Sequence, residues 1–341
     1  MKLPVFVALI INQHTALVYA LTNKSLHLFQ MNKFKINLIA LFILSISLLS
    51  TNGLKAQDGE IKLRYFGTAG WEITDGNVTV LVDPYISRLK LGDGPNSNKE
   101  DTRKVFRPSD YFHSDTVLIN SLITKADFIL VHHSHFDHLS DVPYIAKITG
   151  AKVIGTESTT NVLKAYGIPK EQLYTVKGGE DYQFENFSVR ILESIHSALN
   201  KKHYFDSRTI PATVTAPMKI SEFVEGGSLM FLARFENHKV LTMGSMNYIE
   251  RELSGLRPDI MLPGVNFSRL EIYKYTERMM QLTGFPKTVI PAHWDNFRLP
   301  YGYSQEKAIN DKVKPFIEEV KAASPNSNVI TPVHLEVITI K

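Results

Sequence analysis

His133-Ser134-His135-Phe136-Asp137-His138 indicates the fold more strongly than any other segment of the chain, and it has the pattern H-x-H-x-D-H. The apolar run before it, residues 126–131, is typical of a buried strand, and residues 140–148 after it are typical of a helix. The cluster therefore lies on a strand-to-helix loop, where α/β proteins commonly place ligand sites. Alternate side chains of an extended segment share a side, so His133, His135 and Asp137 can point one way before His138 turns off at the loop.

The chemistry of this cluster predicts a metal centre. Two imidazoles can hold one ion while the carboxylate and the last imidazole hold a second ion nearby. Imidazole and carboxylate ligands without cysteine suit zinc and also tolerate iron or manganese. His132 does not fit the spacing, and we expect it to face the other side of the strand, hydrogen-bonded in the core or to a metal ligand. The alternative is a polar loop that binds no ligand.

Three further motifs accompany the cluster, and each follows or contains an apolar run typical of a strand. They are Val80-Leu81-Val82-Asp83-Pro84, Ile191-Leu192-Glu193-Ser194-Ile195-His196 and Val289-Ile290-Pro291-Ala292-His293. In this order, the motifs resemble those of the metallo-β-lactamase-fold hydrolases, and the resemblance covers nearly all of residues 61–341. It implies a four-layer αββα sandwich, in which two facing sheets are flanked by helices; periodicity alone would give only an α/β fold.

The resemblance also implies a ligand set for two ions. The first ion is bound by His133, His135 and His196, and the second by Asp137, His138 and His293. Asp83 is expected to orient a ligand histidine rather than to bind metal. Asp137 is also the expected catalytic residue, because its carboxylate can orient a metal-bound hydroxide and pass a proton to the leaving group.

One motif departs from the family pattern. The strand at residues 239–243 ends in Gly244-Ser245, where the family usually has Gly-Asp with the Asp bridging the two metals. A hydroxyl is a poor zinc ligand beside a carboxylate, so Ser245 is expected to hydrogen-bond a metal-bound water instead. The third subclass of metallo-β-lactamases also has Ser at this place. We therefore expect one or two zinc ions per chain, with the second bound more weakly; the alternative is a protein that is not catalytic.

Finer features favour one branch of the family. The segments Leu63-Arg64-Tyr65-Phe66-Gly67-Thr68-Ala69-Gly70-Trp71 and Asp83-Pro84-Tyr85 look most like the ascorbate-phosphate lactonases and the N-acylphosphatidylethanolamine-hydrolysing phospholipase D enzymes. The segment Ser194-Ile195-His196-Ser197 lacks the Gly-His-Thr-like motif of antibiotic β-lactamases, which argues against that activity. The iron-containing oxygen-reducing relatives usually have Glu where His135 stands, which favours zinc here.

The N-terminal part of the chain predicts export. Residues 1–56 read as a leader: residues 1–30 have no clear role, and a signal peptide spans 31–56. It has a basic start after Met31, an apolar run over 36–50 and a cleavage point before Gln57. The alternative is a membrane anchor or a buried helix. We expect a periplasmic or secreted single domain over 57–341, with no membrane span after the leader and no cysteine for a lipid anchor.

Charge argues against a nucleic-acid partner. Five of the 38 basic residues and none of the 34 acidic residues lie in residues 1–56, so 33 basic residues face 34 acidic ones in the remainder. The net charge of −1 leaves no excess of basic residues with which to attract a polyanion.

The rest of the chain alternates between strand and helix patterns, with two polar interruptions. Residues 87–116 and 200–227 each follow a motif strand and can overhang the metal site as lids; surface decoration is the alternative. The other expected elements are strands at 152–155, 182–192 and 333–340 and helices at 158–166, 268–282 and 304–323, the last interrupted by Pro315.

Together these features predict an exported zinc-dependent hydrolase that uses metal-bound hydroxide to cut an ester, lactone or phosphodiester. Its substrate is expected to be a small or lipid-like molecule. Candidate substrate contacts are His203, Tyr204, Arg208 and Trp294. Two alternatives stay open: an iron-dependent oxidoreductase acting on a sulfur compound, and a metal-binding member of the fold without catalysis.

Overall fold

The computed structural model describes residues 59–92, 100–199, 203–204 and 206–341. The expected leader lies outside these residues, so the signal peptide stays a prediction. Residues Gln57–Lys341 form one compact unit. Within the described ranges, no helix combines the length and the apolar character needed to cross a membrane.

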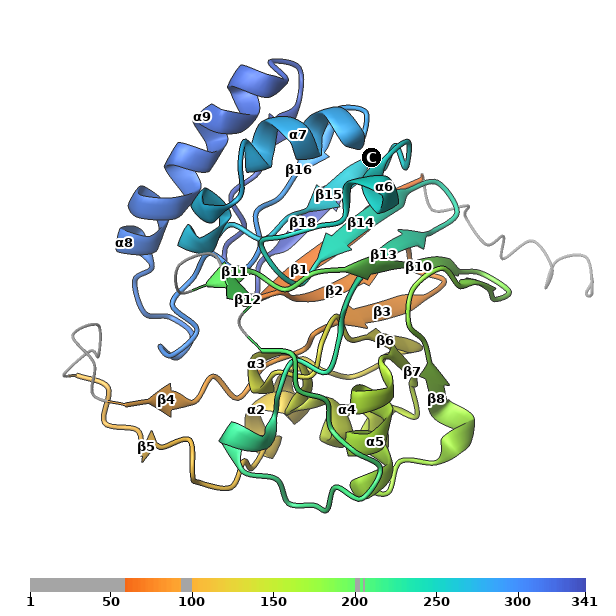
Figure 1. Cartoon of the computed structure of the whole chain (residues 1–341), viewed down its shortest axis with the longest axis vertical. Helices are drawn as coiled ribbons and strands as arrows, with labels where there is room; N and C mark the ends of the chain where they lie inside the picture. The colour runs from red at the N-terminus through yellow and green to blue at the C-terminus, as the bar shows by residue number, and fades with distance from the viewer. Residues whose placement is uncertain (1–58, 93–99, 200–202, 205) are drawn as a thin grey trace, which may run out of the picture. The chain divides into compact units, whose positions relative to one another are not determined.

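Two seven-stranded sheets form the centre of this unit (Figure 1). The first has the strand order β18-β1-β2-β3-β6-β7-β8. Its strands are β1 (Ile61–Gly67), β2 (Gly70–Thr74), β3 (Thr79–Val82), β6 (Phe128–Leu130), β7 (Lys152–Gly155), β8 (Leu173–Thr175) and β18 (Val337–Ile340). Pairing is antiparallel from β18 to β3 and parallel from β3 to β8.

The second sheet repeats this plan with the order β17-β16-β15-β14-β13-β10-β9. Its strands are β9 (Asp181–Gln183), β10 (Ser188–Ser194), β13 (Ser228–Arg234), β14 (Lys239–Met243), β15 (Ile260–Leu262), β16 (Thr288–Val289) and β17 (Asn328–Val329). The pairs from β9 to β14 are antiparallel, and those from β14 to β17 are parallel. The parallel strands of each sheet deliver the main ligand loops at their ends.

Helices cover the outer face of each sheet, which gives the expected αββα layers (Figure 1). The first sheet is covered by α2 (Thr116–Leu122), α3 (Phe136–Leu139), α4 (Val142–Thr149) and α5 (Glu157–Ala165). The second is covered by α6 (Glu250–Leu253), α7 (Tyr275–Leu282), α8 (Glu306–Ala308) and α9 (Lys314–Ala323). The predicted fold class is therefore confirmed.

Alternation along the strands explains why both sheet faces are buried. On β3, Val80 and Val82 belong to the apolar core between the sheets, whereas Leu81 belongs to the core beneath α4 and α5. On β6, Leu130 and Ile129 divide in the same way. The apolar cores on both faces fix the ends of these strands, and so they also fix the ligand loops that follow.

Several predicted elements are found with small shifts. The strand at 152–155 is β7, and the helix expected at 158–166 is α5, which begins one residue earlier. The region 182–192 contains β9 and β10 separated by a turn. The strand expected at 333–340 is shorter, because β18 spans only Val337–Ile340. The helix expected at 140–148 is α4, which ends at Gly150 with a left-handed φ of 72°.

Of the two predicted long helices, one was wrong in its continuity. Residues 268–282 split into the 3₁₀ helix η3 (Phe267–Glu271) and α7, because Lys274 adopts a left-handed φ of 47° that no α-helix accommodates. The helix expected at 304–323 is found as one unbroken helical run over 306–323, made of α8, the π-helical turn η4 (Ile309–Val313) and α9. Pro315, the predicted interruption, closely follows the π-helical turn, a local irregularity with which a helix can accommodate a proline.

Candidate metal centre

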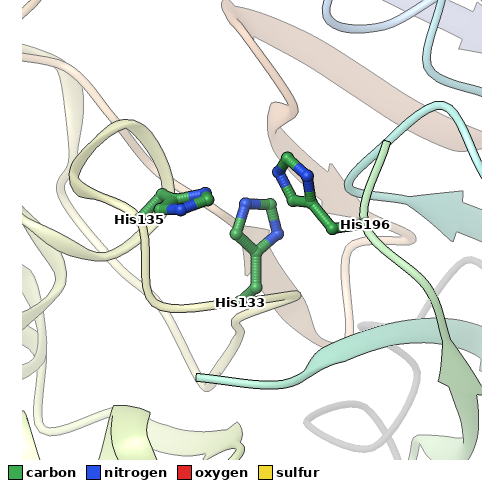
Figure 2. A group of neighbouring side chains, drawn as sticks. All are labelled: His133, His135 and His196. Atoms are coloured by element: carbon green, nitrogen blue, oxygen red, sulfur yellow. The ribbon is translucent and has the colours of Figure 1, made fainter. Parts of the chain in front are cut away.

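Three imidazoles converge on one point (Figure 2). His133 follows β6, His135 caps the N-terminus of α3, and His196 follows β10. The ring of His133 lies 4.8 Å from that of His135 and 4.8 Å from that of His196, measured between centroids, with interplanar angles of 89° and 88°. The rings of His135 and His196 lie 4.9 Å apart at 85°. Three rings arranged in this way can direct one nitrogen each at a single metal ion.

A second ligand group lies beside the first. Asp137 and His138 come from α3, and His293 follows β16. The Oδ2 atom of Asp137 lies 3.8 Å from Nε2 of His138 and 3.5 Å from Nε2 of His293. The rings of His138 and His133 are only 3.8 Å apart, so the two groups share a wall. The structure thus brings together all six predicted ligands, in two sets of three.

These spacings fit metal ions. Around a tetrahedral zinc ion with ligands at about 2.1 Å, the ligand atoms lie roughly 3.4 Å from one another. The distances from the Asp137 oxygen to the His138 and His293 nitrogens are close to this value. Among the described residues, neither ring nitrogen of buried His133 has a hydrogen-bond partner. Buried polar atoms are normally satisfied, so these nitrogens call for a ligand that the protein does not supply.

Electrostatics hold the first group in the form that binds metal. Burial, reinforced by neighbouring imidazoles, lowers the pKa of His133 well below its usual value. Burial likewise lowers the pKa of His135 to about 4 and that of His196 to about 3. Neutral imidazole is the metal-binding form, so these three rings are prepared for an ion at neutral pH.

Asp83 forms a hydrogen bond with a histidine of the second ligand group. Its Oδ2 lies 2.5 Å from Nδ1 of His138 and 2.6 Å from Nδ1 of His132, distances of hydrogen bonds rather than of ligands across an ion. Burial would raise the pKa of Asp83, but the two imidazoles hold it well below the usual value. Asp83 therefore orients His138 with Nε2 toward the metal site, as predicted. Nε2 of His132 lies 2.9 Å from Oγ1 of Thr242, so His132 is a core residue, also as predicted.

His293 has a corresponding support that the sequence reading missed. His293 adopts a left-handed φ of 54°, and its N–H donates to the carbonyl of Thr68 at 2.5 Å. The N–H of Thr68 in turn donates to Asp295 at 2.8 Å, and Asp295 forms a buried ion pair with Arg88, also 2.8 Å long. The signal was present in the sequence, because an acidic residue two positions after a ligand histidine is a natural candidate for support.

Ser245 binds a neighbouring serine. Its Oγ accepts a hydrogen bond from the backbone N–H of Ser197 at 2.8 Å and lies 2.6 Å from the Ser197 hydroxyl. This places Ser245 beside His196, on the wall of the site. The preceding Gly244 is required, because a Cβ there would lie 2.3 Å from the Cβ of His132.

The metal cavity, of about 1000 Å³, opens over both ligand groups. The two polar interruptions line it, as predicted for lids. Wall residues from these segments are Leu91, Gly92, Phe106, Arg107, Pro108, Asp206, Arg208, Ile220, Ser221 and Phe223. The carboxylate of Asp141 anchors the first interruption by accepting the N–H groups of Ile86 and Ser87, each at 2.8 Å.

Of the four predicted substrate contacts, the structure places one in the metal cavity and one in the core. Arg208 lines the metal cavity and forms an ion pair with Asp206 at 2.9 Å. Trp294 is not a cavity residue: its side chain is 2% exposed and stacks on His334, with ring centroids 6.1 Å apart. The core environment of Trp294 thus argues against the predicted contact. The side chains of His203 and Tyr204 lie outside the described part of the structure.

Comparisons with known proteins agree with this geometry. The family model described as "Beta-lactamase superfamily domain" matches residues 62–293, a range that contains all six ligands. A UPF0173 metal-dependent hydrolase of Staphylococcus aureus strain JH9 is 29% identical over 170 residues. That match covers 50% of this chain and 61% of the relative, so less than two thirds of the relative's length is matched.

Two solved structures share the fold at low identity. Igni18, a metallo hydrolase from the archaeon Ignicoccus hospitalis, has a TM-score of 0.52 at 17% identity; the match covers 83% of this chain and 99% of that one. CmlA, a diiron β-hydroxylase from Streptomyces venezuelae, has a TM-score of 0.52 at 14% identity, over 82% of this chain and 54% of that one. Each is similar to this chain in architecture.

Proposed function

Because this chain belongs to the β-lactamase superfamily, we propose that it is a metal-dependent hydrolase whose reaction takes place over the two ligand groups. The observation that carries the proposal is the arrangement of six buried His and Asp ligands in two adjacent sets at the floor of one cavity. Such paired sites suit displacement reactions in which both the attacking and the leaving oxygen need stabilisation.

Zinc is the proposed metal. The donors are five imidazoles and one carboxylate, with no thiolate, a set that zinc accepts readily. His133, His135 and His196 would hold the first ion, and Asp137, His138 and His293 the second. Ser245 supplies no bridging carboxylate, so the second ion is held less firmly than the first.

The chemistry divides between the metal and Asp137. A bound divalent ion lowers the pKa of coordinated water toward about 7 and polarises the bond to be cut. Burial opposes ionisation of Asp137, but His138 and His293 hold the pKa of its carboxyl below the usual value. Asp137 is therefore a carboxylate at neutral pH, able to orient a water molecule and to carry its proton toward the leaving group.

The proposed substrate is an ester, lactone or phosphodiester of small or lipid-like type. The metal cavity has room for a substrate with a sizeable apolar part, and its walls include Phe106, Phe136, Phe223 and Phe297. Aromatic walls bury the body of a substrate while a few polar groups fix the reacting bond.

The test is turnover by zinc-loaded protein of 4-nitrophenyl acetate, γ-butyrolactone and bis(4-nitrophenyl) phosphate. We expect hydrolysis of at least one, loss of that activity on chelation and its return with added zinc. Protein that holds zinc and turns over none of the three classes would contradict the proposal. Tightly retained iron after growth with both metals would favour the oxidoreductase alternative.

Export is proposed from the sequence of residues 31–56, with its basic start, apolar run and cleavage point. Protein recovered from the cell envelope should begin near Gln57, as read by N-terminal sequencing. A leader still attached to cytoplasmic protein would contradict export and leave the hydrolase proposal untouched, because every proposed ligand lies after residue 61.

A further inference from the structure

A second cavity of about 550 Å³ lies against the segment that follows His293. It is bounded by that segment, by the start of η3 and by the chain from Ser304 to Lys312. Asn266, Phe297 and Arg298 line both this cavity and the metal cavity, so the two share a wall. A molecule whose reacting bond lies over the metal ligands can therefore place another of its groups here.

Lys312 is the first sign of what this cavity binds. Its side chain is partly buried on η4, with Nζ 5.4 Å from the ring centroid of Phe267. Among the described residues, no carboxylate lies within the 4.0 Å of an ion pair with Lys312. Burial lowers the pKa of Lys312 despite the more distant Asp295 and Asp311. The ring of Phe267 offers a cation–π contact, but a desolvated ammonium without a carboxylate partner is still unfavourable unless an anion joins it.

The acidic residues that line the second cavity already have other partners. Asp295 accepts from Arg88 at 2.8 Å and lies 3.0 Å from Nε2 of His334. Asp311 accepts from Lys307 at 2.7 Å. These two carboxylates are therefore matched by other basic groups, which leaves Lys312 as a positive group facing the cavity.

Gln305 adds a donor to the same cavity. Its Oε1 accepts the backbone N–H of Asn296 at 2.8 Å, which fixes the amide so that the NH₂ group is directed elsewhere. Among the described residues, the buried Nε2 of Gln305 has no hydrogen-bond partner. Arg298, also a lining residue, has an exposed side chain and a backbone held by Asn296 and Arg103. Ammonium, amide N–H and guanidinium are all donors, and together they suit an anion.

We propose that this second cavity is an anion subsite, defined by Arg298, Gln305 and Lys312, which binds a carboxylate or phosphate group of the substrate away from the reacting bond. The inference rests on the proposed function for the identity of the reacting bond. It narrows the substrate class to anionic esters, lactones or phosphodiesters. The apolar part of such a substrate lies in the metal cavity, and its anionic group lies in the neighbouring second cavity.

The first experiment compares two esters on zinc-loaded full-length protein: neutral 4-nitrophenyl butyrate and the anionic mono-4-nitrophenyl ester of glutaric acid. Lys312→Met should raise KM for the anionic ester about tenfold, the effect of one charge-assisted hydrogen bond, and leave the neutral ester unchanged. Lys312→Arg should retain most of the affinity. Lys321→Met is the matched control, because Lys321 is exposed on α9 and pairs with Glu318.

The second experiment reads binding without turnover. Calorimetric titration of the same proteins with inorganic phosphate should show a millimolar binding event that Lys312→Met weakens about tenfold and that Lys312→Arg and Lys321→Met keep. This result supports the subsite even where neither ester is cleaved, an outcome that counts against the hydrolase proposal alone. Equal phosphate affinity in all variants, or equal KM changes for both esters, would overturn the subsite.

Discussion

The two halves of the metal centre are supported in different ways. The first half, His133, His135 and His196, is a set of buried imidazoles whose pKa values are lowered. The second half, Asp137, His138 and His293, is backed by buried carboxylates. Asp83 contacts His138 directly, and Asp295 reaches His293 through Thr68.

The contrast shows how the protein compensates the charge of an ion. Three neutral rings can bind a cation but cannot neutralise it. In the second half, burial lowers the pKa of His138, but Asp83 and Asp137 outweigh burial and raise it. The second half therefore carries the negative charge, and each half should respond differently to loss of a carboxylate.

The largest effect is expected from Asp137→Ala, which removes a ligand and the proposed proton carrier together. Hydrolytic activity should fall by about two to four orders of magnitude, while circular dichroism stays unchanged because Asp137 lies in the short helix α3 at the floor of the cavity rather than within a sheet. The control is Asp181→Ala, which removes a surface ion pair with Arg234. Full activity in Asp137→Ala would remove this residue from the mechanism.

Asp83→Asn should weaken the second ion and spare the first. Loss of the charge behind His138 is expected to lower affinity for one zinc equivalent about 10- to 100-fold, as measured by chelator competition. Asp141→Asn is the matched buried control, because the carboxylate of Asp141 binds the backbone N–H groups of Ile86 and Ser87. An equal loss at both ions would show that the halves are not supported separately.

Ser245→Asp should bring the zinc affinities of the two halves closer together. A carboxylate at this position can bridge the ions, as in the family pattern, and we expect about tenfold tighter binding of the second equivalent. The exchange also removes the Ser197 hydroxyl contact, so Ser245→Ala separates that loss from the gain. Weaker binding in Ser245→Asp than in Ser245→Ala would show that the position cannot reach the metals.

A smaller effect concerns pH and metal-free protein. Burial lowers the pKa of His135 to about 4 and that of His196 to about 3, below the ordinary value near 6.5. Between these values the unfolded chain binds more protons than the folded one, so stability falls as pH falls from about 6.5 toward 3. Denaturant titrations should show this slope reduced in His135→Gln. A stability that rises on acidification over this range would contradict the neutral state of the first half.

The sequence predicted the site better than its surroundings, for physical reasons. Ligand chemistry is local, so H-x-H-x-D-H, Asp83, His196 and His293 could be recognised from residue type and position after strands. The break at Lys274 depends on a backbone conformation that periodicity does not reveal. Trp294 was misjudged because an aromatic residue beside a ligand can face either way, and only tertiary packing places it against His334.

Long-range pairing was also beyond the sequence. Arg88 and Asp295 are more than 200 positions apart, and nothing local marks them as partners. The cavity lined by Lys312 and Gln305 could not be predicted either, because it forms only where η4 approaches the segment after His293. The branch of the family is still a prediction, because the matches reach the superfamily alone.

Zinc stoichiometry and affinity, measured on the same purified protein, are the strictest check on the proposed metal centre. Elemental analysis after loading and dialysis, with chelator competition for each equivalent, should give between one and two zinc ions per chain. The second ion should be the weaker. Two ions of equal affinity would contradict the inequality of the halves, and protein without any transition metal after loading would contradict the metal centre itself.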